Sequence, residues 1–166
     1  QPQNVALQKR FFDKYLKGID NGWEKEPRVE VQIRAPGDKI KRQAQSTSWP
    51  LAEAKHVKFY LDANTKGMGT RVPGAAASAS YPALTQGVNF TTAPFEKDTE
   101  IVGPAMLKLF VSSSAADMDI FATLCAFDPD GKEMTFIGAP ERFCPVTQGW
   151  LRVSQRKTDP SRPNDY

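Results

Sequence analysis

The sequence is poor in cysteine and histidine, and it contains no long apolar run. Its two cysteines, Cys125 and Cys144, have neither CxxC spacing nor histidine partners, which excludes the usual zinc patterns. We predict two buried thiols, with a disulfide between them as the alternative. No apolar run approaches the roughly 18 residues of a membrane span, and the N-terminus lacks the charged-then-apolar pattern of a signal peptide. The sequence therefore predicts no membrane insertion.

A strong excess of one charge is also lacking. The chain has 22 basic and 19 acidic residues, and no basic patch is interleaved with aromatic residues. This balance predicts no nucleic-acid partner. With 166 residues, of which 40% are hydrophobic, the chain is long enough to bury one core. Its 13 prolines and 11 glycines divide it into short segments, which favours a mainly β architecture over a helical bundle.

One amphipathic helix is predicted at the N-terminus. Asn4 suits the cap position of a helix that begins at Val5, and Gly18 ends it. The helix carries an apolar stripe formed by Leu7, Phe11, Phe12, Tyr15 and Leu16. Such a stripe is too large to leave in water, so we expect this helix to dock on another part of the protein.

The rest of the chain predicts short strands and turns. Alternating or apolar β-type runs occupy residues 28–34, 57–62, 105–112, 120–126 and 150–154, and residues 87–92 are expected to form an edge strand. The DPDG sequence at 128–131 predicts a tight turn with a return strand at 132–137. The Gly-, Ala- and Ser-rich stretch 64–85 predicts a long surface loop. We expect the core at 103–156, with strand 120–126 covered on both faces.

Three groups of residues invite a functional interpretation. His56 is the one histidine, but a nucleophile needs a histidine oriented by an acid, so we predict a structural or surface role. Asp117, Asp119, Asp128 and Asp130 suggest a calcium site. The spacing is not that of an EF-hand, and about ten residues of strand, or ~30 Å, separate the two pairs, so we predict turn and strand-end hydrogen bonds instead.

The third group is aromatic. Trp49, Tyr60, Tyr81 and Trp150 together suggest a platform for a sugar, as in a stand-alone carbohydrate-binding β-sandwich module. The alternative, which we favour, is packing in the core and between domains. The aromatic helix ahead of the strands also suits docking to a second domain better than it suits a lone lectin.

Three blocks in order resemble a known family. They are FFDKYLKG at 11–18, then LKLFVSS at 107–113 with DMD at 117–119 and DPDG at 128–131, and finally GWLRVSQR at 149–156. The first resembles the last helix of the α/β-hydrolase domain in the X-Pro dipeptidyl-peptidase and cocaine esterase (CocE/NonD) serine hydrolases. The others resemble the C-terminal domain of those enzymes. Gln155 stands where many members of the family have histidine.

The resemblance implies a fold and a division of the chain. It implies a mainly β domain, a jelly-roll β-sandwich of galactose-binding-like fold, preceded by one α-helix from the end of an α/β-hydrolase domain. Residues 1–26 would be that terminal helix and its linker, and residues 27–166 the jelly-roll sandwich. Members of the family continue with further strands after the GWLR strand, so we expect a piece of a larger polypeptide and an incomplete sandwich.

The resemblance also implies where the chemistry lies. The family carries a Ser-His-Asp triad on its hydrolase domain, with the nucleophile on a G-x-S-x-G elbow. No such elbow occurs in this sequence. We therefore predict no catalytic residue, no cofactor and no metal site in this chain. The expected partner is the α/β-hydrolase catalytic domain of the same polypeptide, whose substrate cleft the chain would help to form, with homo-oligomerisation left open.

Overall fold

The computed structural model describes residues 2–35, 37, 39–138 and 141–156. It is mainly β with a single α-helix, as the sequence predicts, whereas the finer jelly-roll arrangement stays a prediction. The helical elements are α1 (Pro2–Lys17) and the short 3₁₀ turns η1 (Trp23–Lys25) and η3 (Val153–Gln155). The strands are β1 (Val29–Ala35), β2 (Lys39–Ser46), β3 (Tyr60–Asp62), β4 (Gly67–Gly69), β5 (Asp119–Leu124), β6 (Ala126–Phe127), β7 (Glu133–Met134) and β8 (Thr147–Arg152). Within these residues, no helix is both long and apolar enough to cross a bilayer.

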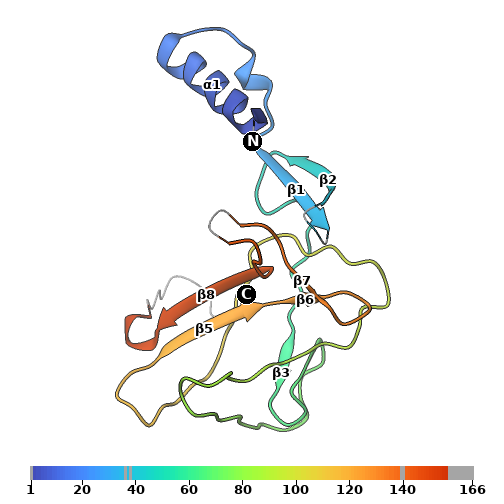
Figure 1. Ribbon diagram of the computed structural model, residues 1–166, viewed down its shortest axis with the longest axis vertical. Coiled ribbons are helices and arrows are strands. Elements are labelled where there is room, and N and C mark those ends of the chain that lie inside the picture. Colours follow the sequence, from blue (N-terminus) through green and yellow to red (C-terminus); the bar gives the residue numbers. More distant parts are fainter. Residues whose placement is uncertain (1, 36, 38, 139–140, 157–166) are drawn as a thin grey trace.

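The strands form four antiparallel pairs, which are β1–β2, β3–β4, β5–β8 and β6–β7. Figure 1 shows α1 at one end of an elongated molecule, the β1–β2 hairpin next to it, and the other three pairs at the far end. The β5–β8 pair joins strands that are distant in sequence, whereas the other three pairs join consecutive strands. This pair is therefore the one long-range strand contact in the described part of the chain.

Helix α1 begins earlier than the sequence predicts and ends where it predicts. It starts at Pro2, whose fixed φ suits a first helical turn, and not at Val5. Gly18 ends it with a left-handed φ of 67°, and its N–H donates to the Lys14 carbonyl at 3.1 Å. The Asp13 carboxylate accepts hydrogen bonds from Lys9 at 2.5 Å and Lys17 at 2.7 Å, one turn to either side. These i, i+4 pairs stabilise the helix.

The small core lies at the β1–β2 hairpin, and not in the 103–156 stretch that the sequence predicts. Its buried residues are Ile33, Ala44 and Leu51, against which Val29, Val31, Ala54 and Val102 pack. Strand β1 buries alternate residues, as its sequence predicts. Arg42 of β2 holds Glu100 by hydrogen bonds of 2.8 and 3.1 Å, which ties the hairpin to the segment containing Val102.

Two predictions about the 103–156 stretch are wrong. Residues 105–112 form no strand, because no neighbouring segment of the described chain supplies a ladder of hydrogen bonds. Strand β5 is also not covered on both faces: its exposure alternates along the strand, and Phe121 is 78% exposed. Alternation therefore sets which side chains share a face, but it does not provide the element that covers that face.

Other predicted elements are shorter than expected or absent. Of the strand predicted at 57–62, only Tyr60–Asp62 pairs, with β4 inside the predicted surface loop. Residues 87–92 form no strand and contribute a single bridge, between Gly67 and Thr91. The return strand after the DPDG turn is only Glu133–Met134, and β8 begins at Thr147 rather than at Trp150. Pro140, at which the sequence predicts the start of a loop that runs to residue 148, lies outside the described residues.

Candidate functional site

The most defined polar arrangement joins the start of β5 to the turn after β8. Asp117 precedes β5, and its carboxylate accepts hydrogen bonds from the backbone N–H groups of Met118, at 2.9 Å, and of Ser154, at 3.0 Å. The Ser154 hydroxyl donates a third, short hydrogen bond to the same carboxylate. The Val153 N–H adds a backbone bond of 2.9 Å to the Met118 carbonyl. Asp117 thus fixes the end of the long-range strand pair.

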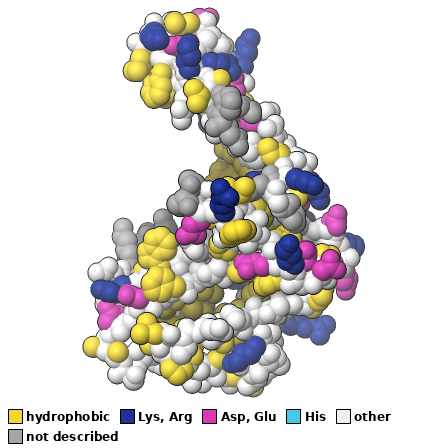
Figure 2. All heavy atoms as spheres, in the orientation of Figure 1, with side chains coloured by type: hydrophobic (Ala, Val, Ile, Leu, Met, Phe, Trp, Pro, Cys, Tyr) yellow, Lys and Arg dark blue, Asp and Glu magenta, His cyan; other side chains and the backbone are white. Residues whose placement is uncertain are grey.

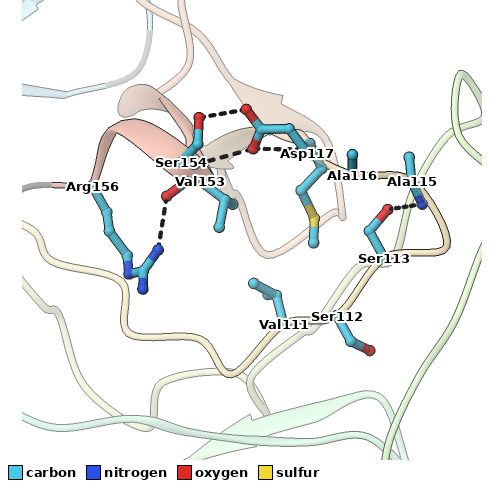
Figure 3. A pocket seen from close by; sticks show the side chains of 10 residues that line it. Val111, Ser112, Ser113, Ala115, Ala116, Asp117, Val153, Ser154 and Arg156 are labelled. Atoms are coloured by element: carbon cyan, nitrogen blue, oxygen red, sulfur yellow. Dashed lines mark hydrogen bonds between the residues drawn. The ribbon is translucent and has the colours of Figure 1, made fainter.

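A pocket of about 330 Å³ lies beside Asp117. Figure 3 shows it between the loop that leads into β5 and the turn η3. Its lining side chains are Val111, Ser112, Ser113, Ala115, Ala116, Asp117, Met118, Val153, Ser154 and Arg156. The Arg156 guanidinium donates to the Val153 carbonyl at 3.2 Å, and the Ser113 hydroxyl accepts from the Ala115 N–H at 3.0 Å. Both of these side chains are thus bonded to the backbone of the rim itself.

The polar contacts of this pocket have a structural role, because Asp117 is bonded to the turn after β8. Hydrogen bonding by Ser154, with help from the backbone of Met118, lowers the pKa of the Asp117 carboxyl from its ordinary value. A carboxylate stabilised in its charged form is a poor general base. A serine nucleophile needs a base within hydrogen-bond reach, and His56 does not line this pocket. The arrangement holds the start of β5 to the turn after β8.

A second ionic contact lies one step along the same strands. Asp119 of β5 is in register with Arg152 of β8, and the guanidinium donates two hydrogen bonds of 2.7 and 2.8 Å to the carboxylate. The ion pair lowers the pKa of Asp119 and raises that of Arg152. Such two-pronged pairing fixes the relative orientation of the two side chains and favours their charged forms.

The four aspartates that suggested a calcium site do not form a metal-binding cluster in the described structure. Asp117 and Asp119 bond to Ser154 and Arg152, whereas the Asp128 carboxylate accepts from the backbone N–H groups of Asp130, at 3.1 Å, and Lys132, at 2.9 Å. The DPDG turn is thereby closed by its own first residue. Across the described ranges, no group of three or more His, Cys, Asp or Glu side chains is placed to hold a metal ion.

The two cysteines are free thiols in the structure, and both are half-buried. Burial, assisted by a hydrogen bond with Glu133, raises the pKa of Cys125 from 9.0 to about 11. Cys144 lies in the loop before β8, where its thiol is 3.7 Å from the Glu141 carbonyl oxygen. A thiol with a raised pKa is a poor nucleophile at neutral pH, so Cys125 is not suited to catalysis.

The four aromatic residues considered as a sugar platform do not form one. Trp49 follows β2, Tyr60 begins β3, Tyr81 lies in the loop after β4, and Trp150 lies in β8. All four are at least partly exposed, at 37–73%. Among the described residues, none of these four rings stacks on another of the four. A continuous row of rings, which binding to a polysaccharide needs, is therefore absent from the described chain.

The aromatic cluster that does form is on α1. The Phe11 ring lies 4.8 Å from Tyr15, 5.3 Å from Phe12 and 5.3 Å from Trp23 of η1, measured between ring centroids. Much of this cluster still faces outward, because Phe12 is 50% and Tyr15 62% exposed. The Arg10 side chain reaches Glu26, which holds the linker against the helix. The helix thus presents a pre-ordered apolar face.

Sequence reasoning missed three residue pairs in this region. It did not place Ser154 against Asp117 or Arg152 against Asp119, because 37 and 33 residues separate these pairs. It also did not place Phe121 beside Trp150, which face each other in the β5–β8 register. The runs predicted from the sequence, 120–126 and 150–154, differ in length, and the two strands match at 6 residues each only in the structure. The sequence therefore carries no clear signal for these contacts.

Comparisons with known proteins identify relatives over nearly the whole chain. Residues 21–164 match the family described as X-Pro dipeptidyl-peptidase C-terminal non-catalytic domain. Cocaine esterase from Rhodococcus sp. is 24% identical over 93% of this chain and 31% of its own length. A solved CocE/NonD family hydrolase from Staphylococcus aureus is 29% identical, with a TM-score of 0.78 over 96% of this chain and 29% of its own. The chain thus spans under a third of the length of these relatives.

Proposed function

The chain belongs to the family of X-Pro dipeptidyl-peptidase C-terminal non-catalytic domains, and from this membership we propose that it is the accessory β domain of a serine hydrolase. The hydrolase is of the CocE/NonD type, and its covalent chemistry is carried by residues outside this chain. We call that longer hydrolase chain the parent polypeptide. Its catalytic domain is the partner of the domain described here.

One observation carries the proposal. The family match extends over residues 21–164, and the best-defined polar site within that span is the Asp117 carboxylate, which accepts three hydrogen bonds and joins two strands. An acyl-transfer enzyme needs a nucleophile, a base and an oxyanion hole in one place. Asp117 and Ser154 provide neither an available base nor a group that could activate the hydroxyl. The domain therefore contributes position and shape rather than bond making.

Helix α1 indicates how the domain is attached to the catalytic domain. We propose that residues 1–26 complete the α/β-hydrolase domain and that residues 27–166 form the accessory sandwich. The outward-facing rings of Phe12 and Tyr15, fixed by their contacts with Phe11, pack on the catalytic domain. Burial of these rings removes apolar surface from water and holds the sandwich at the edge of the substrate cleft.

The substrate class follows the relatives. One relative is a cocaine esterase, and the family is named for X-Pro dipeptidyl-peptidases. We therefore propose that the parent polypeptide cleaves an ester, an amide or an X-Pro peptide through an acyl-enzyme formed on an activated serine. The accessory domain forms part of the wall of that cleft and limits which acyl or amine groups can enter.

The proposal is tested with two samples and two substrates. The parent polypeptide and this chain are each assayed with a p-nitrophenyl ester and an X-Pro p-nitroanilide, with and without a fluorophosphonate that labels activated serines. We expect turnover and labelling of the parent polypeptide alone. Fluorophosphonate-sensitive turnover by this chain would contradict the assignment of the chemistry to the catalytic domain.

A further inference from the structure

The linker that follows α1 is folded back onto the helix. Figure 1 shows the chain turning at the end of α1 and running alongside the helix towards β1. Gly18 makes the turn with a left-handed φ of 67°, and the N–H of Ile19 donates to the Asp13 carbonyl at 3.1 Å. The turn is therefore closed by a backbone hydrogen bond to the C-terminal part of the helix, and the linker starts in contact with α1.

Asn21 fastens the middle of the linker to α1. Its side-chain amide donates to the Arg10 carbonyl at 2.8 Å, and the Arg10 guanidinium donates in return to the Asn21 carbonyl at 3.3 Å. The side-chain oxygen of Asn21 accepts from the N–H of Trp23 at 3.2 Å. Gly22, between these two residues, takes a left-handed φ of 72°, which residues with a side chain rarely adopt. This turn places the Trp23 ring against Phe11, with 5.3 Å between the ring centroids.

Ion pairs hold the linker on both sides of this turn. The Lys14 ammonium lies 2.5 Å from the Glu24 carboxylate and 3.5 Å from the Asp20 carboxylate. Arg10 pairs with Glu26 at the end of the linker. In Figure 2, basic side chains lie next to acidic ones at the α1 end of the molecule. These side chains are at least partly exposed to water, so each pair contributes little to stability by itself, and the ion pairs add to the hydrogen bonds of the turn.

The last residues before β1 are restrained as well. Glu26 is extended, with φ −66° and ψ 141°, and its N–H donates to the Trp23 carbonyl at 3.0 Å. Pro27 follows, and its ring fixes its own φ and restricts the residue before it. Only Arg28 then separates this segment from β1, which begins at Val29. The path of the chain between the helix and the strand is therefore defined over nearly all of its length.

We propose that residues 10–26 form a stiff joint, with Asn21 at its centre, that fixes the direction in which the chain leaves α1 and enters the β domain. This inference rests on the proposed function, which assigns α1 to the hydrolase domain and the residues after the linker to the accessory domain. Two domains joined by an exposed linker move relative to each other by default. Here hydrogen bonds, a ring contact and ion pairs hold the linker on the helix. The joint therefore restrains the β domain from swinging about its connection.

Native-state proteolysis of the parent polypeptide tests the joint. Trypsin cuts after Lys25 only when the linker leaves the helix, so the rate of this cut follows the population of the opened joint. Asn21→Ala removes the side-chain donor to Arg10 and the side-chain acceptor for Trp23. The substitution adds no backbone strain, because the left-handed residue of this turn is Gly22. Since two hydrogen bonds are lost, we expect the cut after Lys25, followed by mass spectrometry, to be about tenfold faster in Asn21→Ala.

Asn64→Ala is the matched control, because Asn64 is an exposed asparagine in the turn between β3 and β4. It should leave the rate of the cut after Lys25 unchanged. Two outcomes would overturn the inference. A rate in the unsubstituted polypeptide close to that of the heat-denatured chain would show that the linker is a flexible tether. One slow rate common to the unsubstituted polypeptide and both variants would show that a covering surface, and not the contacts of Asn21, protects the linker.

Fluorophosphonate labelling of the same samples separates this inference from the proposed function. Rapid cutting after Lys25 in a labelled, active polypeptide would reject the stiff joint alone. Slow cutting that depends on Asn21, in a polypeptide that is neither active nor labelled, would retain the restrained linker and reject the assignment to a serine hydrolase.

Discussion

Asp119 of β5 and Arg152 of β8 face each other, and the guanidinium of Arg152 donates hydrogen bonds of 2.7 and 2.8 Å to the Asp119 carboxylate. The next residues along the chain extend the link, because Asp117 accepts from the backbone and the hydroxyl of Ser154. Two carboxylates thus hold together strands that the sequence separates widely. The only long-range strand pair in the described chain is fixed by side chains as well as by its backbone ladder.

The first prediction concerns the ion pair between Arg152 and Asp119. Arg152→Lys keeps the charge but loses the two-pronged geometry, so it should lower the melting temperature of the parent polypeptide slightly. Arg152→Ala should lower it further, by about 2–4 °C, because an exposed ion pair contributes modestly. Calorimetry measures both. Lys58→Ala, which changes an exposed cation outside β5 and β8, is the control. An unchanged melting temperature in Arg152→Lys, beside a clear loss in Arg152→Ala, would show that the two-pronged geometry is unimportant here.

The second prediction concerns acid. The pKa of Asp117 lies below its ordinary 3.8, chiefly because of the Ser154 hydroxyl, so the folded state favours the charged carboxylate. Its contribution to stability is complete above the ordinary pKa and is lost as the pH falls through the lowered one. Urea midpoints measured from pH 6 to pH 2 should therefore fall less steeply below pH 4 in Asp117→Asn than in the unsubstituted protein. Asp130→Asn, on the exposed DPDG turn, should follow the unsubstituted protein; identical slopes for all three would refute the linkage.

Local features of the fold could be predicted from the sequence. The alternation in 28–34 gave the right face of β1, and the DPDG residues gave a turn in which Gly131 takes a φ of 79° and donates to the Asp128 carbonyl at 3.0 Å. The three blocks of sequence gave a family resemblance that is confirmed over residues 21–164. Each of these depends on residues that are close together in the chain or on their order along it.

Relationships between distant segments could not be predicted. Periodicity shows that Phe121 and Trp150 each point to one face of a strand, but it does not show that the strands are neighbours. The same limit explains residues 105–112, whose alternation is that of a strand although no described segment pairs with them. The core was misplaced for a related reason, since Leu51 lies in a polar stretch and is nevertheless 3% exposed. Burial is set by neighbours in space.

The third prediction concerns Cys125. Burial raises its pKa from 9.0 to about 11. At pH 8 its thiolate fraction is thus about a hundredfold below that of an ordinary thiol, because reactivity follows the thiolate. Alkylation by iodoacetamide, followed on the peptide that contains Cys125, should be about a hundredfold slower in the folded protein than in urea. Rates within threefold of each other would show that the thiol is not shielded.

The fourth prediction concerns the small core. Leu51 is 3% exposed and packs with Ile33 and Ala44 of the hairpin. Leu51→Ala removes that packing and leaves a cavity, so it should reduce the free energy of unfolding by about 2–5 kcal/mol. Ile101→Ala, at a side chain that is 58% exposed, should change it by less than about 1 kcal/mol. Chemical denaturation measures the free energy of unfolding of the two variants. Equal losses in both would mean that Leu51 is not part of a packed core.

The last prediction concerns the outer face of α1. Phe12 is 50% exposed, and its ring lies 5.3 Å from Phe11 in an edge-on arrangement, so it is held ready for a partner surface. If the catalytic domain covers it, Phe12→Ser should weaken the domain contact by about 2 kcal/mol, the value of burying one such ring. Hydrogen exchange of the α1 amides in the parent polypeptide should then accelerate about 30-fold. Val72→Ser removes a side chain that is 69% exposed in a loop far from α1 in the sequence, and it should leave that exchange unchanged. Equal exchange in the two variants would mean that the aromatic face of α1 is not the docking surface.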